Sequence, residues 1–278
     1  MRDSMGYFTG KSAVITGAGS GIGRALARAL NGEGCALYLS DIDEAALAAT
    51  VSSLPHPGVP VDQRRVDVAA KDAMDRWAKD INAQRTAGVD IVINNAGVAY
   101  SARVDACDYA EVQWLMSINF WGVVHGTLAF LPLLKAAPRG HLVNLSSILG
   151  IIGVPTQSAY NAAKFAVRGY TESLRQELAG SSVHVCCVHP GGVSTNIARN
   201  SRGGAPGVTA NDRAAQFEPF ARTTPEAAAA QIIRAIERGQ PRLLIGRDAR
   251  FVDLLARLFP ARYPRLLPGL GQLGQSPE

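Results

Sequence analysis

The stretch SAVITGAGSGIG, residues 12–23, decides the fold of this chain. Residues 12–16 form a short run centred on apolar side chains, which is typical of a buried strand. A glycine-rich turn follows at once, and an apolar helical pattern over 21–33 follows the turn. This order of strand, turn and helix is typical of a site where the pyrophosphate of a dinucleotide meets a helix N-terminus.

Three glycines of the turn have separate tasks. Gly17 permits the tight turn, Gly21 lets the backbone approach a pyrophosphate, and Gly23 lets the helix and the strand pack closely. The spacing is G-x-x-x-G-x-G rather than G-x-G-x-x-G. No G-K-[ST] follows the glycines, which excludes a P-loop nucleotide triphosphatase.

The alternation of short apolar runs with helical patterns continues along the chain. The sequence predicts seven strands, at 12–16, 35–40, 64–68, 90–93, 140–145, 183–188 and 242–245. Helices are predicted between them, at 21–33, 43–54, 71–85, 108–134, 158–179 and 225–237. Strands without polar alternation, each followed by a helix, indicate a parallel sheet covered on both faces. We therefore predict a single-domain, doubly wound (Rossmann-like) α/β fold with about seven parallel strands and helices on both faces.

Two regions depart from this pattern. The segment 196–222 is irregular and longer than an ordinary connection, so we expect a substrate lid there. The dinucleotide-binding and catalytic domain is expected to span 1–246, and 247–278 forms an apolar and basic C-terminal extension.

Composition excludes several classes of protein. Hydrophobic residues make up 47% of the chain and charged residues 18%, which excludes a disordered chain. The net charge of +5 is spread along the chain without a recognition motif, so no nucleic-acid partner is expected. The four cysteines include no C-x-x-C pair, so neither a disulfide scaffold nor a metal site is predicted. Without a signal peptide or an apolar run of about 20 residues, the expected compartment is the cytoplasm.

Asp41 bears on the choice of dinucleotide. It ends the second predicted strand, 18 residues after Gly23, where a carboxylate can accept the ribose hydroxyls of adenosine and repel a 2′-phosphate. The next residue is Ile42 rather than an arginine. NAD is therefore expected, and NADP is disfavoured. Asp67 and the NNAG stretch at 94–97 follow the next two strands, at the sheet edge where ligands bind.

Tyr160 and Lys164 carry the predicted chemistry. They are four residues apart on a predicted helix, so their side chains share one face. A phenol is a poor base near neutral pH, and a nearby ammonium lowers its pKa, so that the phenol can exchange a proton with a substrate oxygen. Ser147, just after the fifth predicted strand, can hold the same oxygen, and Asn119 lies in the preceding long helix.

Taken together, these motifs make the sequence resemble a short-chain dehydrogenase/reductase with a Y-x-x-x-K active site. The matching elements, spread over 12–195, are TGAGSGIG at 16–23, Asp67, NNAG at 94–97, Asn119, Ser147, YNAAK at 160–164 and PGGVST at 190–195. The resemblance implies an enzyme in which Tyr160 is the acid/base and Ser147 orients the substrate. It also implies that Lys164 binds the nicotinamide ribose and tunes Tyr160, while Asn119 holds a water of the proton relay.

The expected cofactor site combines these motifs. Its residues are Gly17, Ser20, Gly21, Ile22, Gly23, Asp41, Asp67, Val68, Asn94, Ala96, Gly97, Tyr160, Lys164, Pro190, Gly191, Val193 and Thr195. The loop that begins at Pro190 is expected to pack against the nicotinamide and its carboxamide.

The substrate is expected to be a hydrophobic secondary alcohol or ketone. Ser147 and the apolar run 148–154 bound the pocket, and the segment 196–222 closes it. That segment also holds four arginines, at 199, 202, 213 and 222, so an anionic or thioester-linked substrate is the alternative. Two other functions remain open: an NADPH-dependent carbonyl or 3-ketoacyl-thioester reductase, and a non-catalytic nucleotide-sensing regulator.

The C-terminal extension has two interpretations. Its apolar stripe, with arginines at 247, 250 and 257 alongside, consists of Phe251, Val252, Leu254, Leu255, Leu258 and Phe259. In the first interpretation, this stripe packs on its own domain or on a neighbouring subunit. In the second, 247–268 docks as an interfacial helix on a membrane. Prolines at 260, 264 and 268 prevent one continuous helix. The apolar face of helix 159–178 and the family resemblance predict a homodimer or homotetramer.

Overall fold

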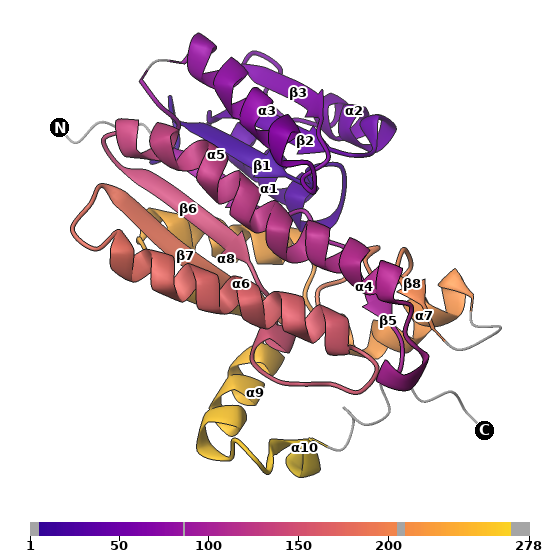
Figure 1. The fold of residues 1–278 in the computed structure, drawn as a ribbon. Helices are drawn as coiled ribbons and strands as arrows, with labels where there is room; N and C mark the ends of the chain where they lie inside the picture. Colours follow the sequence, from indigo (N-terminus) through magenta and orange to yellow (C-terminus); the bar gives the residue numbers. More distant parts are fainter. Residues whose placement is uncertain (1–5, 86, 205–208, 268–278) are drawn as a thin grey trace.

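The computed structural model describes residues 6–85, 87–204 and 209–267. Its main sheet has seven parallel strands, which confirms the predicted number and direction, and their order is β3-β2-β1-β4-β6-β7-β9 (Figure 1). Their bounds are β1 Ser12–Thr16, β2 Ala36–Asp41, β3 Val61–Arg65, β4 Ile91–Asn94, β6 Gly140–Leu145, β7 Val183–Pro190 and β9 Arg242–Ile245. The strand order reverses between β1 and β4, and such a reversal opens a crevice at the carboxyl ends of the strands.

Helices cover both faces of the sheet. One face carries α3 (Lys71–Gln84), α5 (Gly122–Ala136) and α6 (Ser158–Glu177), which lie in front in Figure 1. The other carries α1 (Gly21–Gly32), α2 (Glu44–Ser52) and α8 (Pro225–Glu237). The core has one layer on each side: Trp77 meets Phe130 edge-to-face at 5.2 Å on the first, and Leu26 and Ile232 are buried on the second. The sheet is therefore apolar on both faces, as its unalternating strands predict.

The third strand begins and ends earlier than predicted. The sequence favours 64–68, whereas β3 spans Val61–Arg65 and pairs with β2 from Leu37↔Val61 to Asp41↔Arg65. As an edge strand, β3 needs no apolar run, and its register follows the neighbouring strand. The apolar side chains Val66 and Val68 come after the strand and line the crevice.

The predicted long helix over 108–134 is interrupted. The structure divides it into α4 (Tyr109–Met116), a π-helical turn η2 (Ser117–Trp121) and α5. The run Tyr109–Ala136 is apolar and long enough to cross a bilayer by length and composition alone. Half of the most apolar 18-residue stretch of this run is buried inside the fold, where α5 packs against α3, β4 and β6.

The segment 196–222 is more regular than the sequence suggests. It contains β8 (Arg202–Gly203), α7 (Ala210–Phe217) and the short helix η4 (Glu218–Phe220). β8 pairs in parallel with β5 (Tyr100–Ser101), which forms a second small sheet that the sequence did not predict. Thr209 caps α7 in a reciprocal box with Asp212. The expectation of an irregular loop was wrong because this cap and the pairing with residues 100–101 organise the chain.

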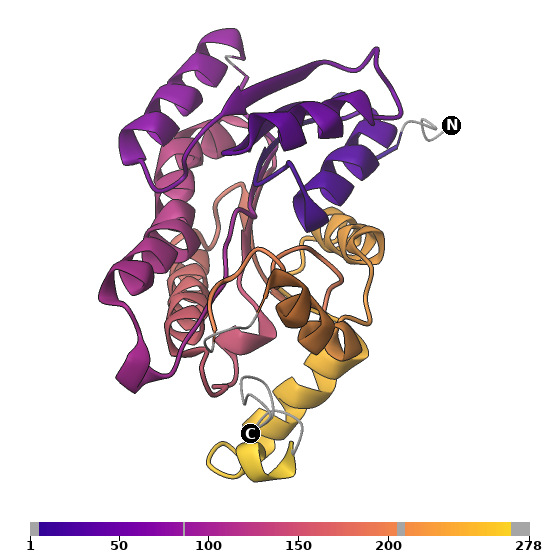
Figure 2. The same ribbon diagram turned by 90° about the vertical axis from the view of Figure 1, so that its right-hand side faces the viewer.

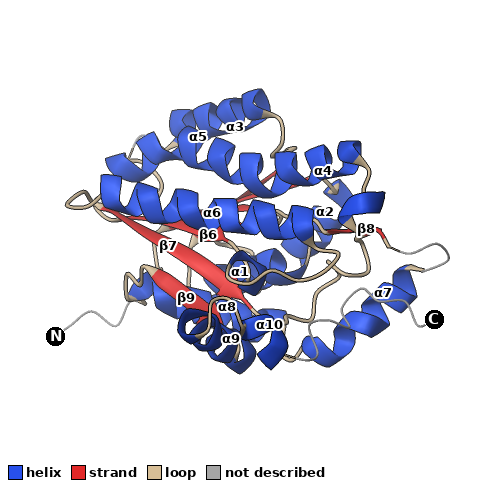
Figure 3. Ribbon diagram, turned by 60° about the horizontal axis from the view of Figure 1, so that its bottom comes forward, coloured by secondary structure: helices blue, strands red, loops and turns tan. Residues whose placement is uncertain are grey.

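The remaining elements surround the carboxyl ends of the strands or extend from them. They are η1 (Val104–Ala106), η3 (Ile148–Gly150), α9 (Arg247–Leu258) and α10 (Tyr263–Leu266). α9 follows edge strand β9 directly and packs against it, and β9 also contacts α8 (Figure 3). α9 and α10 project from one end of the molecule, in yellow in Figure 2.

Candidate active site

One large cavity lies at the carboxyl ends of the strands. Its volume is about 2540 Å³. That volume exceeds the few hundred to about 1000 Å³ of a pocket for one small molecule, so the cavity has room for a dinucleotide and a substrate together. The lining comes from the turn after β1, the ends of β2, β4, β6 and β7, the segment 196–222 and the extension α9–α10.

The glycine-rich turn forms the nucleotide end of this cavity. Gly17 has φ +66°, and a Cβ there would lie 2.7 Å from Ala96 Cα. A Cβ on Gly23 would lie 2.1 Å from Gly17 O, so Gly23 serves packing between helix and turn and does not line the cavity. Ser20 begins α1 without a side-chain cap, and the first turn of α1 holds no acid. Its N–H groups and the positive end of the helix therefore fit a pyrophosphate.

Asp41 joins the end of β2 to the same turn. Its Oδ2 accepts the Gly19 N–H at 2.8 Å, and its Oδ1 accepts the Asp43 N–H at 3.0 Å. Asp41 and the exposed Ile42 line the cavity, so the carboxylate stands where the sequence places an adenosine ribose. Arg65, in register with Asp41, donates from Nε to Ile42 O at 3.2 Å. A guanidinium therefore stands beside this corner of the site.

Some residues of the NNAG stretch line the cavity, and one supports the sheet behind it. Ala96 and Gly97 line the cavity, as do Asp67 and Val68 after β3. Asn94 does not: it is buried, and its amide donates to Asn144 at 2.8 Å and joins β4 to β6. The neighbouring Asn95 lines the cavity instead.

Asn95 was missed by sequence reasoning. Its amide donates to Thr16 O at 2.9 Å and to Gly17 O at 3.0 Å, which holds the glycine-rich turn in place. The strand alternation is the signal that distinguishes the two asparagines, because the last residue of a buried strand points into the core and the next residue leaves it.

Ser147, Tyr160 and Lys164 meet at the catalytic end of the cavity, and all three line it. The Lys164 ammonium donates to Leu145 O at 2.9 Å and lies 5.7 Å from the centre of the Tyr160 ring. The Ser147 hydroxyl accepts the Leu149 N–H at 3.1 Å. This group of side chains can hold a substrate oxygen and exchange a proton with it.

The protonation of this group differs from the expectation that Lys164 lowers the pKa of Tyr160. Burial raises the pKa of Tyr160 to about 12, and a hydrogen bond with Ser147 opposes that rise. Burial lowers the pKa of Lys164 to about 8, because desolvation disfavours its charged form. Burial, rather than the charge of the neighbouring group, is therefore the main cause of both pKa shifts.

Asn119 lies behind the catalytic group in the π-helical turn η2. It is fully buried and outside the cavity lining. Its side chain accepts the Val98 N–H and donates to Val98 O, both at 2.8 Å. A Cβ on Gly97 would lie 3.2 Å from Asn119 Oδ1 and 3.6 Å from Lys164 Nζ, so Asn119 and Lys164 meet at Gly97. π-Helical turns are frequent at functional sites.

The loop after β7 forms another wall of the cavity, with Thr195 beside Gly21 at the start of α1. Pro190, Gly191, Val193 and Thr195 all line the cavity. Asp248 of α9 also lines it and accepts the Gly192 N–H at 2.9 Å. Sequence reasoning missed Asp248, because a loop and a helix 56 positions apart show no common pattern.

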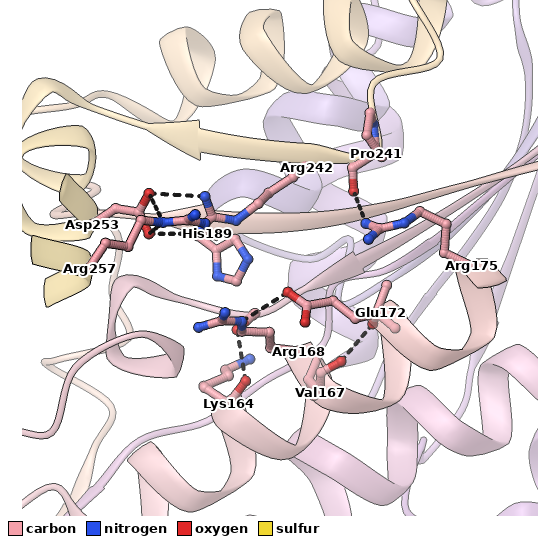
Figure 4. Close-up of polar contacts among 12 residues, drawn as sticks. Lys164, Val167, Arg168, Glu172, Arg175, His189, Pro241, Arg242, Asp253 and Arg257 are labelled. Atoms are coloured by element: carbon pink, nitrogen blue, oxygen red, sulfur yellow. Dashed lines mark hydrogen bonds and ion pairs between the residues drawn. The ribbon is translucent and has the colours of Figure 1, made fainter. Parts of the chain in front are cut away.

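Two other supporting residues were also missed or left without a role. Asn161 donates from Nδ2 to Leu149 O and Ile152 O at 2.7 and 2.6 Å, and so holds the apolar loop over the site. His189 is buried and donates from Nδ1 to Ser147 O at 3.1 Å, which positions the backbone of Ser147 (labelled beside Arg242 in Figure 4). Burial lowers the pKa of His189 to about 4, so its ring is neutral near pH 7.

Comparison with known proteins identifies the family. The family model described as short chain dehydrogenase matches residues 11–205. The chain is 47% identical over 269 residues to a protein named as the oxidoreductase SadH from Mycobacterium tuberculosis (strain ATCC 25618 / H37Rv). The alignment covers 95% of this chain and 96% of SadH.

Two solved structures share the fold over most of their length. A short chain dehydrogenase/reductase from Burkholderia phymatum in complex with NAD has a TM-score of 0.80 and 30% identity, with 99% of each chain covered. An alcohol dehydrogenase from the archaeon Thermococcus sibiricus complexed with 5-hydroxy-NADP has a TM-score of 0.72 and 26% identity, covering 84% of this chain and 95% of its own. The chain is an oxidoreductase of the short-chain dehydrogenase family.

Proposed function

We propose that this protein transfers a hydride between NAD(H) and a hydrophobic secondary alcohol or ketone, with Tyr160 as the acid/base. The observation that carries this proposal is one continuous cavity with two chemically different ends. Uncapped N–H groups of α1 and the Asp41 carboxylate stand at one end, and Ser147, Tyr160 and Lys164 stand at the other.

The chain's own residues manage the proton and the substrate oxygen. A bound nicotinamide supplies the carbon that accepts or donates the hydride. In alcohol oxidation, the O–H bond breaks and Tyr160 Oη takes the proton, while the C–H bonding electrons leave as hydride and a C=O bond forms. Ser147 donates a hydrogen bond to the same oxygen. Lys164 adds positive charge beside Tyr160 when it is protonated, and Asn119 holds the backbone at Val98 beside it.

NAD is the favoured cofactor because of Asp41. The Asp41 carboxylate accepts two backbone N–H groups, which hold it at this corner of the site, and its negative charge would repel a 2′-phosphate. NADP is the second candidate, and Arg65 favours it because its guanidinium stands beside the same corner of the site. Solved relatives carry either type: NAD in the Burkholderia phymatum protein and a 5-hydroxy-NADP in the Thermococcus sibiricus protein.

The substrate end of the cavity favours an apolar molecule. Its apolar lining includes residues from separate parts of the chain, among them Ile148, Leu149, Ile152, Val154, Phe217, Phe220, Phe251, Val252, Leu266 and Leu267. Of the four arginines that favour an anionic substrate, Arg202 lies 3.7 Å from the centre of the Trp114 ring and pairs with Glu111, and Arg199 donates to Asn211 at 2.6 Å. Arg213 and Arg222 line the cavity, so an acyl thioester is the second candidate substrate. A neutral hydrophobic alcohol is favoured because of the apolar lining.

Turnover of a panel of secondary alcohols tests the proposal. The panel holds steroid, terpenoid, retinoid and aliphatic alcohols, each with NAD and with NADP, and nicotinamide absorbance reports the reaction. We expect turnover with NAD, weaker turnover with NADP, and loss in Tyr160→Phe. Tyr170→Phe on the same helix is the matched control, because Tyr170 lies outside the cavity lining. Full activity in Tyr160→Phe would exclude the mechanism. Preference for NADP would mean that Arg65, rather than Asp41, determines which cofactor binds.

Subunit association is part of the same proposal. Trp121, Leu128 and Phe165 are large apolar side chains exposed on η2, α5 and α6. Burying them against a second copy would remove apolar area from water, so a cytoplasmic homodimer or homotetramer built on these helices is proposed. Light scattering on the purified protein gives the mass, and a monomer at micromolar concentration would exclude this assembly.

A further inference from the structure

Helix α9 presents its apolar stripe to solvent. Phe251, Leu254 and Leu258 are 59%, 57% and 62% exposed, and their spacing of three and four residues places them on one face. Phe259 and Leu266 extend this exposed apolar surface toward α10. A helix that packs on its own domain turns such a stripe inward, so α9 has the opposite orientation.

Polar contacts on the inner face hold α9 in this orientation. Asp253 is buried and accepts two hydrogen bonds from Arg242 of β9, at 2.6 and 3.0 Å, and a further contact from Arg257 at 3.1 Å (Figure 4). A bidentate pair of this kind specifies geometry as well as binding. Asp248 is bound to the loop after β7, as described above, so α9 cannot turn its stripe inward without breaking both contacts.

A third contact holds α10 against the body. The Tyr263 hydroxyl accepts the Gly153 N–H at 2.8 Å, beside the apolar loop of the substrate site. The unit formed by α9 and α10 is therefore held by polar contacts to β9, to the loop after β7 and to the loop at 153. It projects from the body of the molecule (Figure 2), and its outer side carries the exposed apolar side chains described above.

Positive charge surrounds this apolar surface. Arg247, Arg250, Arg262 and Arg265 are exposed and form no ion pair with the residues at 6–85, 87–204 and 209–267. The acids of the unit, Asp248 and Asp253, are turned toward the body. A second copy of this surface would bring arginines against arginines, which disfavours self-association here. An anionic surface with an apolar interior complements it instead.

We propose that the α9–α10 unit docks on the surface of an anionic lipid bilayer. The exposed apolar side chains enter the boundary between headgroups and acyl chains, and the arginines contact the anionic headgroups. Phe251, Val252, Leu266 and Leu267 also line the cavity, so the docked surface adjoins the opening to the substrate site. That a lipophilic substrate enters from the bilayer rests on the proposed function, whereas docking itself does not.

Sedimentation with vesicles tests docking without reference to catalysis. The full chain is mixed with vesicles of phosphatidylcholine alone, or with phosphatidylglycerol added, at low and at high salt. We expect binding to the anionic vesicles that weakens as salt rises, and little binding to the neutral vesicles. The variant Leu254→Glu/Leu258→Glu/Phe259→Glu removes the apolar surface outside the cavity lining, and a loss of roughly tenfold or more in the partition coefficient is expected.

A matched variant separates docking from net charge. Ala48→Glu/Ala49→Glu/Ala83→Glu makes the same change in charge on exposed positions of α2 and α3, and it is expected to keep most of the binding. Arg250→Gln/Arg262→Gln/Arg265→Gln is expected to lose the preference for anionic lipid. Circular dichroism checks that each variant is folded.

Each contrary outcome identifies a different error. Absence of vesicle binding by the natural chain, or equal binding by the two glutamate variants, would overturn the proposal. A drop in oligomer mass in the Leu254/Leu258/Phe259 variant, with no vesicle binding by the natural chain, would assign the surface to a second copy. Turnover of a water-soluble alcohol without vesicles tests the proposed function separately, so failure of one proposal leaves the other measurable.

Discussion

At the scale of single residues, the roles proposed for Tyr160 and Lys164 predict how the reaction depends on pH. Burial keeps Tyr160 as a phenol up to a pKa of about 12 and lowers the pKa of Lys164 to about 8. Ketone reduction needs the phenol as proton donor, whereas alcohol oxidation needs the phenolate as proton acceptor. The two directions are therefore expected to respond oppositely to pH.

The pH profile of kcat tests this pair. Below the pKa of Tyr160, oxidation is expected to speed up by up to about tenfold for each unit of pH, because the phenolate fraction grows in that ratio. Reduction is expected to decline as pH rises through about 8, where Lys164 loses its charge. A flat oxidation profile from neutral to alkaline pH would mean that another step limits the rate or that Tyr160 is not the base.

Asp248 is a positioning residue for the loop after β7. Its carboxylate accepts the Gly192 N–H, and a Cβ on Gly192 would lie 1.6 Å from Phe220 O, so this loop has no room to shift toward η4. Removal of a charged acceptor costs about 1.5–3 kcal/mol, which is tenfold or more in affinity. We expect Asp248→Ala to weaken cofactor binding by about tenfold, measured by fluorescence titration.

Asp248→Asn is the control for that prediction. The amide oxygen can still accept the Gly192 N–H, so near-natural cofactor affinity is expected. Equal weakening in the asparagine and alanine variants would show that the charge of Asp248 matters rather than its hydrogen bond.

At the scale of elements, the pair between β9 and α9 stabilises the C-terminal part of the fold. Asp253 is buried, and the guanidinium groups of Arg242 and Arg257 lower its pKa below the ordinary range. Removing one partner of a buried pair leaves the other uncompensated, so Asp253→Asn is expected to lower the free energy of unfolding by about 3 kcal/mol. Urea unfolding near neutral pH measures it.

The sign of the pH dependence follows from the direction of that shift. Because the folded-state pKa of Asp253 is depressed, its contribution is present above the unfolded pKa and is lost as pH falls through the folded value. The difference between the natural chain and Asp253→Asn should therefore shrink in acid. The apolar replacement Arg242→Met/Asp253→Leu is expected to recover most of the stability at neutral pH. A deficit in the double variant as large as that of Asp253→Asn would contradict this account.

At the scale of the whole molecule, stability depends on the two apolar layers of the sheet. Phe130 is fully buried in one of them against Trp77, whereas Leu128 on the same helix is 53% exposed. Phe130→Ala is expected to lower the free energy of unfolding by about 3–5 kcal/mol because it opens a cavity. Leu128→Ala should change it much less in the monomer. Denaturant unfolding at low protein concentration compares the two, and equal losses would mean that Leu128 is buried in an interface.

The local patterns of the sequence determined the fold class and the positions of most strands and helices, and they pointed to Ser147, Tyr160 and Lys164, which the structure brings to one cavity. Apolar runs, helical periodicity and the glycine-rich turn depend on neighbours along the chain, so they can be read without tertiary structure. The spacing of Tyr160 and Lys164 also follows from a single helix. The family of the protein could be inferred from these patterns alone.

Only the tertiary structure decided which residues meet through space. The register of β3 depends on β2, the support of Gly192 depends on Asp248, and the roles of Asn94 and Asn95 depend on which of them points into the core. The outward stripe of α9 follows from the ion pair of Asp253 with β9, against the helix's own periodicity. Likewise, burial set the pKa values of Tyr160 and Lys164. In each case the deciding energy comes from a partner or a degree of desolvation that exists only once the chain has folded.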